Sequence, residues 1–121
     1  MKRKILSKLI EWKNKKNRKP LIVNGARQVG KTYILKEFGS HYYEKMAYVN
    51  CDKNKTLDKI FSQDYNISRI LLSLSAILHV NIEPENTLII FDEIQENPTV
   101  LNSLKYFCED APDYHIIVAG S

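Results

Sequence analysis

The chain has 121 residues, 44% of them hydrophobic and 26% charged, which is the composition of one soluble globular domain. Its longest apolar runs are far short of the roughly 20 residues that cross a bilayer, so a transmembrane helix is excluded. The N-terminal lysines precede no continuous apolar region and no small-residue cleavage site, so we expect no secretory signal and a cytoplasmic protein. Cys51 and Cys108 lie far apart and the histidines are scattered, a pattern that favours reduced thiols over a disulfide or a metal site.

The formal net charge of +4 is distributed unevenly along the chain. Residues 1–19 contain nine basic side chains against Glu11 alone, whereas residues 20–121 contain nine basic and 13 acidic side chains. A basic segment of this kind can bind nucleic acid or an anionic membrane surface, or it can be the solvated face of a helix. Trp12 is its only aromatic residue and no nucleic-acid-binding motif accompanies it, so the solvated face is the favoured interpretation.

The first apolar residues recur at helical spacing and predict a helix over residues 4–16 whose apolar stripe packs on the domain. The apolar run 20–24 predicts a strand, and a glycine-containing stretch then leads into a helix that Gly39 is expected to end. The other expected strands cover residues 46–51, 87–91 and 114–119. The other expected helices cover residues 56–61 and 67–78 and a segment that begins at residue 98.

Capping signals mark two of these helices. Asp64 or Asn66 can cap the helix over 67–78, and Asn97 followed by Pro98 is typical of an N-cap and a first helical position. The apolar face of the last helix is expected to consist of Val100, Leu101, Leu104, Phe107 and Cys108. Strands that alternate with helices predict right-handed βαβ units and a parallel sheet covered on both faces, a three-layer α/β fold.

The stretch after the first strand has the pattern G-x-x-x-x-G-K-[ST]. Its residues are Gly25, Ala26, Arg27, Gln28, Val29, Gly30, Lys31 and Thr32. The glycines let consecutive N–H groups point at phosphate oxygens, and the N-terminus of the following helix adds a partial positive charge. The lysine suits the β- and γ-phosphates, and the threonine hydroxyl suits Mg²⁺. Strand, glycine loop and helix in this order favour a phosphate-binding loop over an ordinary glycine turn.

Asp92 and Glu93 directly follow the continuous apolar run 87–91, which is typical of a strand buried on both faces. Ligands of parallel α/β sheets bind at the carboxyl ends of the strands, so both carboxylates are expected beside the phosphate-binding loop. Asp92 is expected to hold Mg²⁺ through its waters, and Glu93 to orient and deprotonate a water for in-line attack on the γ-phosphate. The alternatives are a strand-end residue that caps a turn for Asp92 and a surface residue for Glu93.

Other classes of phosphate-loop protein fit these residues less well. GTPases read guanine with an Asn-Lys-x-Asp segment, which the chain lacks, and small-molecule kinases need no glutamate beside the aspartate. Residues 92–95 match the D-E-x-Q of some helicases. Those enzymes usually have a much longer insertion between the two motifs, and no second recombinase-like domain is evident here.

Three segments carry a resemblance: GARQVGKT at 25–32, LIIFDEIQ at 88–95 and IIVAGS at 116–121. Together they resemble the prokaryotic AAA-type ATPases whose full-length members carry a C-terminal domain of unknown function. The resemblance covers essentially the whole chain. It implies ATP as the nucleotide, a Walker A motif at 25–32, a Walker B motif at 88–92 and a catalytic role for Glu93. Ser121 matches the polar residue that senses the γ-phosphate, whereas Arg27 and Gln28 match the loop without an assigned side-chain role.

The chain departs from this family after its fourth expected strand. Proteins of the superfamily order their sheet 5-1-4-3-2, and no fifth strand, helical lid or arginine finger follows Ser121. We therefore expect an N-terminal piece of a longer ATPase, with residues 1–19 as a basic helix and linker and residues 20–121 as an incomplete core. Residues 21–24 would then form an edge strand with unpaired backbone groups beside an exposed apolar face, and we expect self-association.

Three functions compete at this point. The first is Mg²⁺-dependent ATP binding and hydrolysis by an AAA-type module. The second is a nucleotide-binding fragment with weak or no turnover, because the missing finger and lid supply charge to the transition state. The third is a nucleic-acid-binding module that uses the basic N-terminal segment.

Overall fold

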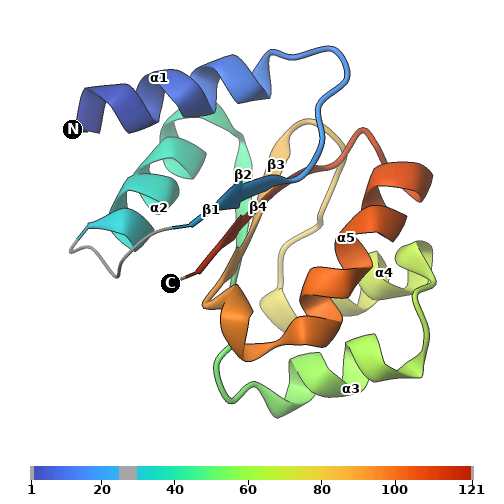
Figure 1. Ribbon diagram of the computed structural model, residues 1–121. Coiled ribbons are helices and arrows are strands. Elements are labelled where there is room, and N and C mark those ends of the chain that lie inside the picture. Colours follow the sequence, from blue (N-terminus) through green and yellow to red (C-terminus); the bar gives the residue numbers. More distant parts are fainter. Residues whose placement is uncertain (1, 25–29, 121) are drawn as a thin grey trace.

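The structure, a computed structural model, describes residues 2–24 and 30–120. The described elements alternate between helices and strands along most of the chain (Figure 1). In chain order they are α1 (Lys2–Lys13), β1 (Leu21–Val23), α2 (Lys31–Tyr42), β2 (Lys45–Asn50), α3 (Lys55–Gln63), α4 (Ile67–Leu78), β3 (Thr87–Asp92), the 3₁₀ helix η1 (Ile94–Glu96), α5 (Pro98–Asp110) and β4 (His115–Ala119). No helix in this part of the chain is long and apolar enough to cross a membrane.

The four described strands form one parallel sheet in the order β1-β4-β3-β2. Every residue of β3 and β4 is buried, as expected for central strands of a parallel sheet. Helices α1 and α2 cover one face of the sheet, and α3, α4 and α5 cover the other (Figure 1). The predicted three-layer α/β class with a parallel sheet is therefore confirmed.

Two apolar cores, one on each face of the sheet, hold these layers together. On the side of α1 and α2, the core includes Leu9, Trp12, Leu35 and Phe38. The other core is larger and joins the opposite face of the sheet to α3, α4 and α5. The predicted docking of the first helix is correct, because Leu9 and Trp12 are buried, although α1 ends at Lys13 and not near residue 16.

The prediction that Gly39 ends the second helix is wrong. Helix α2 continues to Tyr42, and Gly39 lies buried within it. A Cβ atom at this position would lie 2.6 Å from Sδ of Met46 and 3.3 Å from Cδ2 of Leu88. Helix α2 approaches β2 and β3 closely at this position. Because glycine has no side chain, it fits between them.

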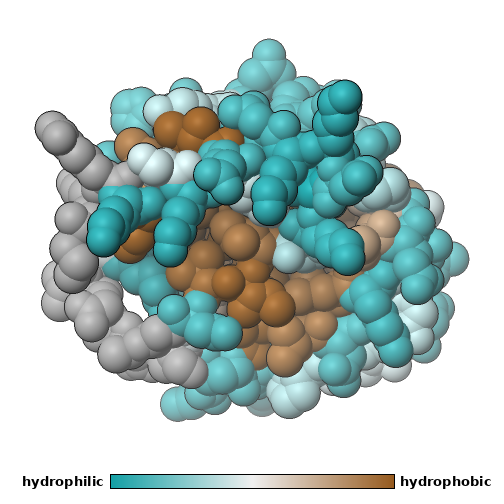
Figure 2. All heavy atoms as spheres, turned by 45° about the horizontal axis from the view of Figure 1, so that its top comes forward, coloured by the Kyte–Doolittle hydropathy of each residue, from teal (hydrophilic) through white to brown (hydrophobic). Residues whose placement is uncertain are grey.

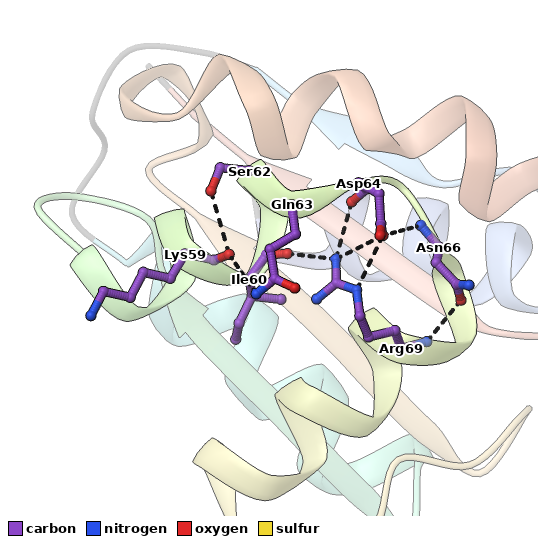
Figure 3. A network of polar contacts seen from close by, with 7 residues as sticks. All are labelled: Lys59, Ile60, Ser62, Gln63, Asp64, Asn66 and Arg69. Carbon is purple, nitrogen blue, oxygen red and sulfur yellow. Dashed lines mark hydrogen bonds and ion pairs between the residues drawn. The ribbon is translucent and has the colours of Figure 1, made fainter.

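The two helix starts with capping signals are capped by asparagine. Oδ1 of Asn66 accepts a hydrogen bond from the Arg69 N–H at 3.0 Å, and Oδ1 of Asn97 accepts one from the Val100 N–H at 3.2 Å. Asp64 has a different role, because its Oδ1 accepts hydrogen bonds from the Arg69 guanidinium at 3.0 and 3.1 Å (Figure 3). The Asn66 N–H, and then Arg69, lower the pKa of the Asp64 carboxyl. Asn66 is thus the cap, and Asp64 fixes the turn between α3 and α4.

The predicted apolar face of α5 is correct only in part. Val100, Leu104 and Phe107 are buried, but Leu101 is 38% exposed. Ser103 is fully buried instead, with its hydroxyl donating to the Val100 carbonyl at 2.6 Å. A small polar side chain can be buried on a helix face when it bonds to the preceding turn.

Strand β1 forms one edge of the described sheet. Its neighbour is β4, with Leu21 opposite Ile117 and Val23 opposite Ala119. The side chains of Leu21 and Val23 pack toward α1 and α2, whereas Ile22 is 50% exposed. Figure 2, which views the molecule from the side of α1 and β1, shows an apolar hollow with hydrophilic side chains around it.

Candidate functional site

The described candidate residues meet at the carboxyl ends of the parallel strands. Lys31 and Thr32 begin α2, while Asp92 ends β3 and Glu93 follows it directly. The structure thus brings Thr32 and Asp92 together, and the roles expected for these residues stay predictions. The candidates Gly25, Ala26, Arg27, Gln28 and Val29, and also Ser121, lie outside the described residues.

Gly30 leads the chain into α2 in a conformation that favours glycine. Its φ is 103° and its ψ is −6°, and a side chain would strain this backbone. Its carbonyl accepts the hydrogen bond of the Ile34 N–H at 2.8 Å, so the helix is hydrogen-bonded from its first turn. Lys31 and Thr32 consequently stand in that first turn, where the helix dipole favours an anion.

A hydrogen bond from Thr32 to Asp92 links the two sequence motifs. The Thr32 hydroxyl donates to Oδ2 of Asp92 at 2.7 Å across 60 residues of sequence. Asp92 is only 3% exposed, so this carboxylate is held within the protein and not at its surface. The bond joins the N-terminus of α2 to the carboxyl end of β3.

Two further donors reach the same carboxylate. The Tyr48 hydroxyl donates to Oδ2 at 2.6 Å, and the Glu93 N–H donates to Oδ1 at 2.9 Å. Burial, followed by the hydrogen bond to Asp92, raises the pKa of Tyr48 above its ordinary value, so the phenol keeps its proton and remains a donor. The sequence did not predict Tyr48 as a site residue. It indicates only that Tyr48 lies on an expected strand, two residues before Asn50. Asn50 pairs with Asp92, and that register is what brings Tyr48 to the site.

Cys51 follows β2 beside the same group. Its N–H donates to the Asp92 carbonyl at 2.8 Å, and its side chain is 1% exposed. Burial, with a smaller contribution from the charge of Asp92, raises the pKa of its thiol to about 12. The thiol is therefore protonated at neutral pH and unsuited to nucleophilic chemistry.

Lys31 links this group to the end of the fourth strand. Its Nζ donates to the Gly120 carbonyl at 2.7 Å, across 89 residues of sequence. The Gly120 N–H in turn donates to the Val23 carbonyl at 3.2 Å. The ends of β1 and β4 and the start of α2 are thus connected through hydrogen bonds that the sequence pattern did not predict.

Glu93 has an uncommon backbone conformation for its residue type. Its φ of 54° and ψ of 45° lie in the left-handed region, which costs free energy for any residue with a side chain. Oε1 of Glu93 accepts a hydrogen bond from Nε2 of Gln95 at 2.7 Å, so η1 directs a side chain back onto the carboxylate. This turn orients Glu93 on the same edge of the sheet as Asp92.

The described oxygen atoms fit a small divalent cation bound together with phosphate. A hydroxyl and a carboxylate separated by 2.7 Å, those of Thr32 and Asp92, are the ligand types that Mg²⁺ prefers. Mg²⁺ also keeps several waters and takes its other ligands from substrate phosphates, so few protein ligands suffice.

A cavity of about 550 Å³ lies away from these candidate residues. It is lined by residues of α4, the segment that follows it and the end of α5.

One comparison with known proteins identifies a family. The family model described as "AAA domain" matches residues 17–121, which is essentially the whole chain. No curated protein and no solved structure matches the chain. The match agrees with the parallel sheet and with the pairing of Thr32 and Asp92 at its carboxyl edge. The chain therefore belongs to the AAA domain family, which implies a P-loop nucleotide-binding ATPase module.

Proposed function

We propose that this chain binds ATP together with Mg²⁺ at the carboxyl edge of the sheet, in the cytoplasm, and that the AAA module hydrolyses the β–γ phosphoanhydride bond. The observation that carries the proposal is the 2.7 Å hydrogen bond between Thr32 and Asp92. It brings the hydroxyl of the phosphate-binding motif into contact with a buried strand-end carboxylate. Family membership supports the same assignment.

In this proposal, each part of the site has one task in binding. The backbone of residues 25–30 and the N-terminus of α2 bind the phosphate oxygens, and Lys31 supplies a charge to the β- and γ-phosphates. Thr32 and Asp92 hold Mg²⁺, the latter through water. When bound, Mg²⁺ neutralises charge on the phosphate oxygens.

The hydrolytic step is assigned to Glu93. Its carboxylate follows Asp92 directly and is held by Gln95, so it can take a proton from a water that attacks the γ-phosphate in line. Ser121 is proposed to contact the γ-phosphate. Binding with weak or no turnover is the competing proposal, and it uses the same binding residues without the step at Glu93.

The binding proposal is tested by thermal unfolding with and without Mg·ATP. At a free concentration 100 times the dissociation constant, the ligand should stabilise the fold by about 2.7 kcal/mol. Lys31→Ala should abolish this shift, whereas Lys59→Ala should preserve it, because Lys59 is an exposed lysine on α3. A wild-type protein whose unfolding temperature does not respond to Mg·ATP would contradict the proposal.

Nucleic-acid binding through the basic segment of residues 1–19 is a separate proposal. Trp12, its only aromatic residue, is 6% exposed and donates from Nε1 to the Lys19 carbonyl at 2.7 Å. An indole held in this way cannot stack on a base, which removes one common source of single-strand affinity. The proposal then relies on phosphate contacts alone, and such binding should weaken steeply as salt is added.

We also propose that the chain associates with itself through the β1 edge. The support is the position of β1 at the edge of the described sheet and the half-exposed side chain of Ile22. A strand edge offers backbone donors and acceptors to a second copy, and the apolar hollow of Figure 2 offers surface to bury.

A further inference from the structure

Tyr48 stands in the middle of the candidate site but belongs to neither sequence motif. It lies on β2, opposite Ile90 of β3, and its half-buried side chain extends on the face of the sheet that α2 covers. The hydroxyl reaches the carboxyl end of β3 and donates to Oδ2 of Asp92 at 2.6 Å. This contact joins residues 44 positions apart and is as short as the bond from Thr32.

The Asp92 carboxylate has three described donors, and they restrict its rotation. Thr32 and Tyr48 both donate to Oδ2, and the Glu93 N–H donates to Oδ1. Thr32 belongs to the phosphate-binding motif, and Glu93 directly follows Asp92 in the carboxylate motif. Tyr48 alone among the three comes from a different strand, so it fixes the carboxylate relative to the sheet.

The tyrosine ring is itself held in place. Nζ of Lys36 lies 4.0 Å from the ring centroid, a cation–π arrangement. Lys36 is on α2, one helical turn beyond Thr32, so the ring packs against the helix that carries Thr32. The phenol is therefore a fixed donor and not a flexible surface group.

We propose that Tyr48 is a positioning residue for the magnesium site: its hydroxyl orients Asp92 and thereby sets the affinity of the nucleotide-bound protein for Mg²⁺. The inference rests on the proposed function, because it requires Mg²⁺ to bind between Thr32, Asp92 and the phosphates. Partners that orient metal-binding carboxylates typically change metal affinity by 10- to 100-fold when they are removed. The predicted effect is therefore on Mg²⁺ and not on the nucleotide itself.

The test uses the full chain and the variant Tyr48→Phe, which keeps the ring and loses the hydroxyl. Unfolding temperature is measured at a fixed saturating ATP concentration while free Mg²⁺ is varied, and again with ATP in EDTA. The variant should need about 10-fold more Mg²⁺ for half of the magnesium-dependent shift. Its response to ATP in EDTA should equal that of the wild type.

Tyr43→Phe is the matched control. Its hydroxyl also makes a buried hydrogen bond, 2.6 Å from Nδ1 of His115, but at the start of β4 and away from Asp92. This variant should show the wild-type Mg²⁺ dependence even if its stability without ligand is lower. A Mg²⁺ midpoint that Tyr48→Phe leaves unchanged overturns the inference while the proposed function stands.

Two other outcomes also count against the inference. Equal loss of ATP binding with and without Mg²⁺ in Tyr48→Phe would make Tyr48 a structural or nucleotide-contacting residue, and not one that acts through Asp92. A wild-type protein that responds to ATP under neither condition overturns the proposed function, and the role of Tyr48 with it.

Discussion

Asp92 concentrates the polar contacts of the site in one side chain. The carboxylate is 3% exposed and accepts hydrogen bonds from Thr32, Tyr48 and the N–H of Glu93. A carboxylate that is only an acceptor can satisfy all three donors, whereas an amide or a protonated acid would place a hydrogen against one of them. These three donors hold the carboxylate at the carboxyl end of β3, where we propose that Mg²⁺ binds.

At the same scale, Glu93→Gln should separate binding from turnover. The substitution keeps the size of the side chain but removes the base, so phosphate release should fall by about 10²- to 10⁴-fold while the Mg·ATP thermal shift persists. Glu96→Gln is the control, because Glu96 lies exposed on η1. Phosphate release is measured at saturating Mg·ATP. Equal release from the wild type and Glu93→Gln would favour a module that binds without turnover.

The sequence predicted some of these residues and missed others for a physical reason. Thr32 and Asp92 belong to local patterns at the end of a strand and the start of a helix, and parallel sheets bring such positions to one edge. Tyr48 belongs to no local motif, and Gly120 lies in the segment IIVAGS, which does not indicate its contact with Lys31. Their roles depend on the register of β2 with β3 and on the pairing of β4 with β1, which single-sequence periodicity does not specify.

Among the elements, α1 is fixed to the domain by a small group of polar and aromatic side chains. The Trp12 ring meets His115 edge-on at 5.8 Å between centroids, and the Tyr43 hydroxyl lies 2.6 Å from Nδ1 of His115. His115 is 3% exposed at the start of β4. The helix is therefore packed against the amino end of the sheet, opposite the edge that carries Asp92.

This group predicts how stability depends on pH. Burial, and then the charges of Arg18 and Lys13, lower the pKa of His115 from 6.5 to about 4. Between these values the unfolded chain binds a proton that the folded chain does not, so stability falls as pH falls from 6.5 to 4. The loss should be about 3 kcal/mol, since one pKa unit corresponds to about 1.4 kcal/mol.

The measurement is the free energy of unfolding in urea at pH 7, 5.5 and 4.5. The loss between pH 7 and 4.5 should be smaller in His115→Gln than in the wild type, because the titrating group is gone. His79→Gln, at the exposed C-terminal end of α4, is the control and should keep the wild-type dependence. Identical pH profiles for His115→Gln and the wild type would show that His115 does not contribute.

The helices and strands could be predicted from the sequence where the local sequence pattern and the tertiary packing favour the same structure. The run 87–91 became the fully buried β3, and Asn97 became the N-cap of α5. Gly39 shows the opposite case. As a helix stop it is only a statistical signal, whereas in the structure it lies inside α2 close to Met46 and Leu88 of neighbouring strands, which no local pattern reveals.

At the scale of the whole molecule, the two faces of the sheet are covered by helices, whereas its β1 edge is not covered by another described strand. Helices cover both faces of the central strands, while β1 lies at an edge of the sheet (Figure 1). The side chain of Ile22 on β1 is half exposed. Burial of apolar surface of this kind in a second copy is favourable by roughly 25 cal/mol for each Å² removed from water.

The proposed self-association should therefore depend on Ile22. Light scattering over increasing protein concentration should show a rising mass for the wild type and a monomer for Ile22→Lys, because a charge at this edge opposes strand pairing. Leu72→Lys is the control: Leu72 is 74% exposed on α4, on the opposite face of the sheet from α1. A wild-type chain that stays monomeric at high concentration would contradict the proposal.

The pairing of β1 with β4 also determines when the site can assemble during folding. Leu21 faces Ile117, and Lys31 bonds to Gly120 across 89 residues, so β1 has no strand partner in the described sheet until β4 has formed. Strands β2 and β3 can pair earlier, because fewer residues separate them along the chain than separate β1 from β4. The strand that carries the phosphate-binding loop consequently joins the sheet last. We therefore expect nucleotide binding to require the pairing of β1 with β4.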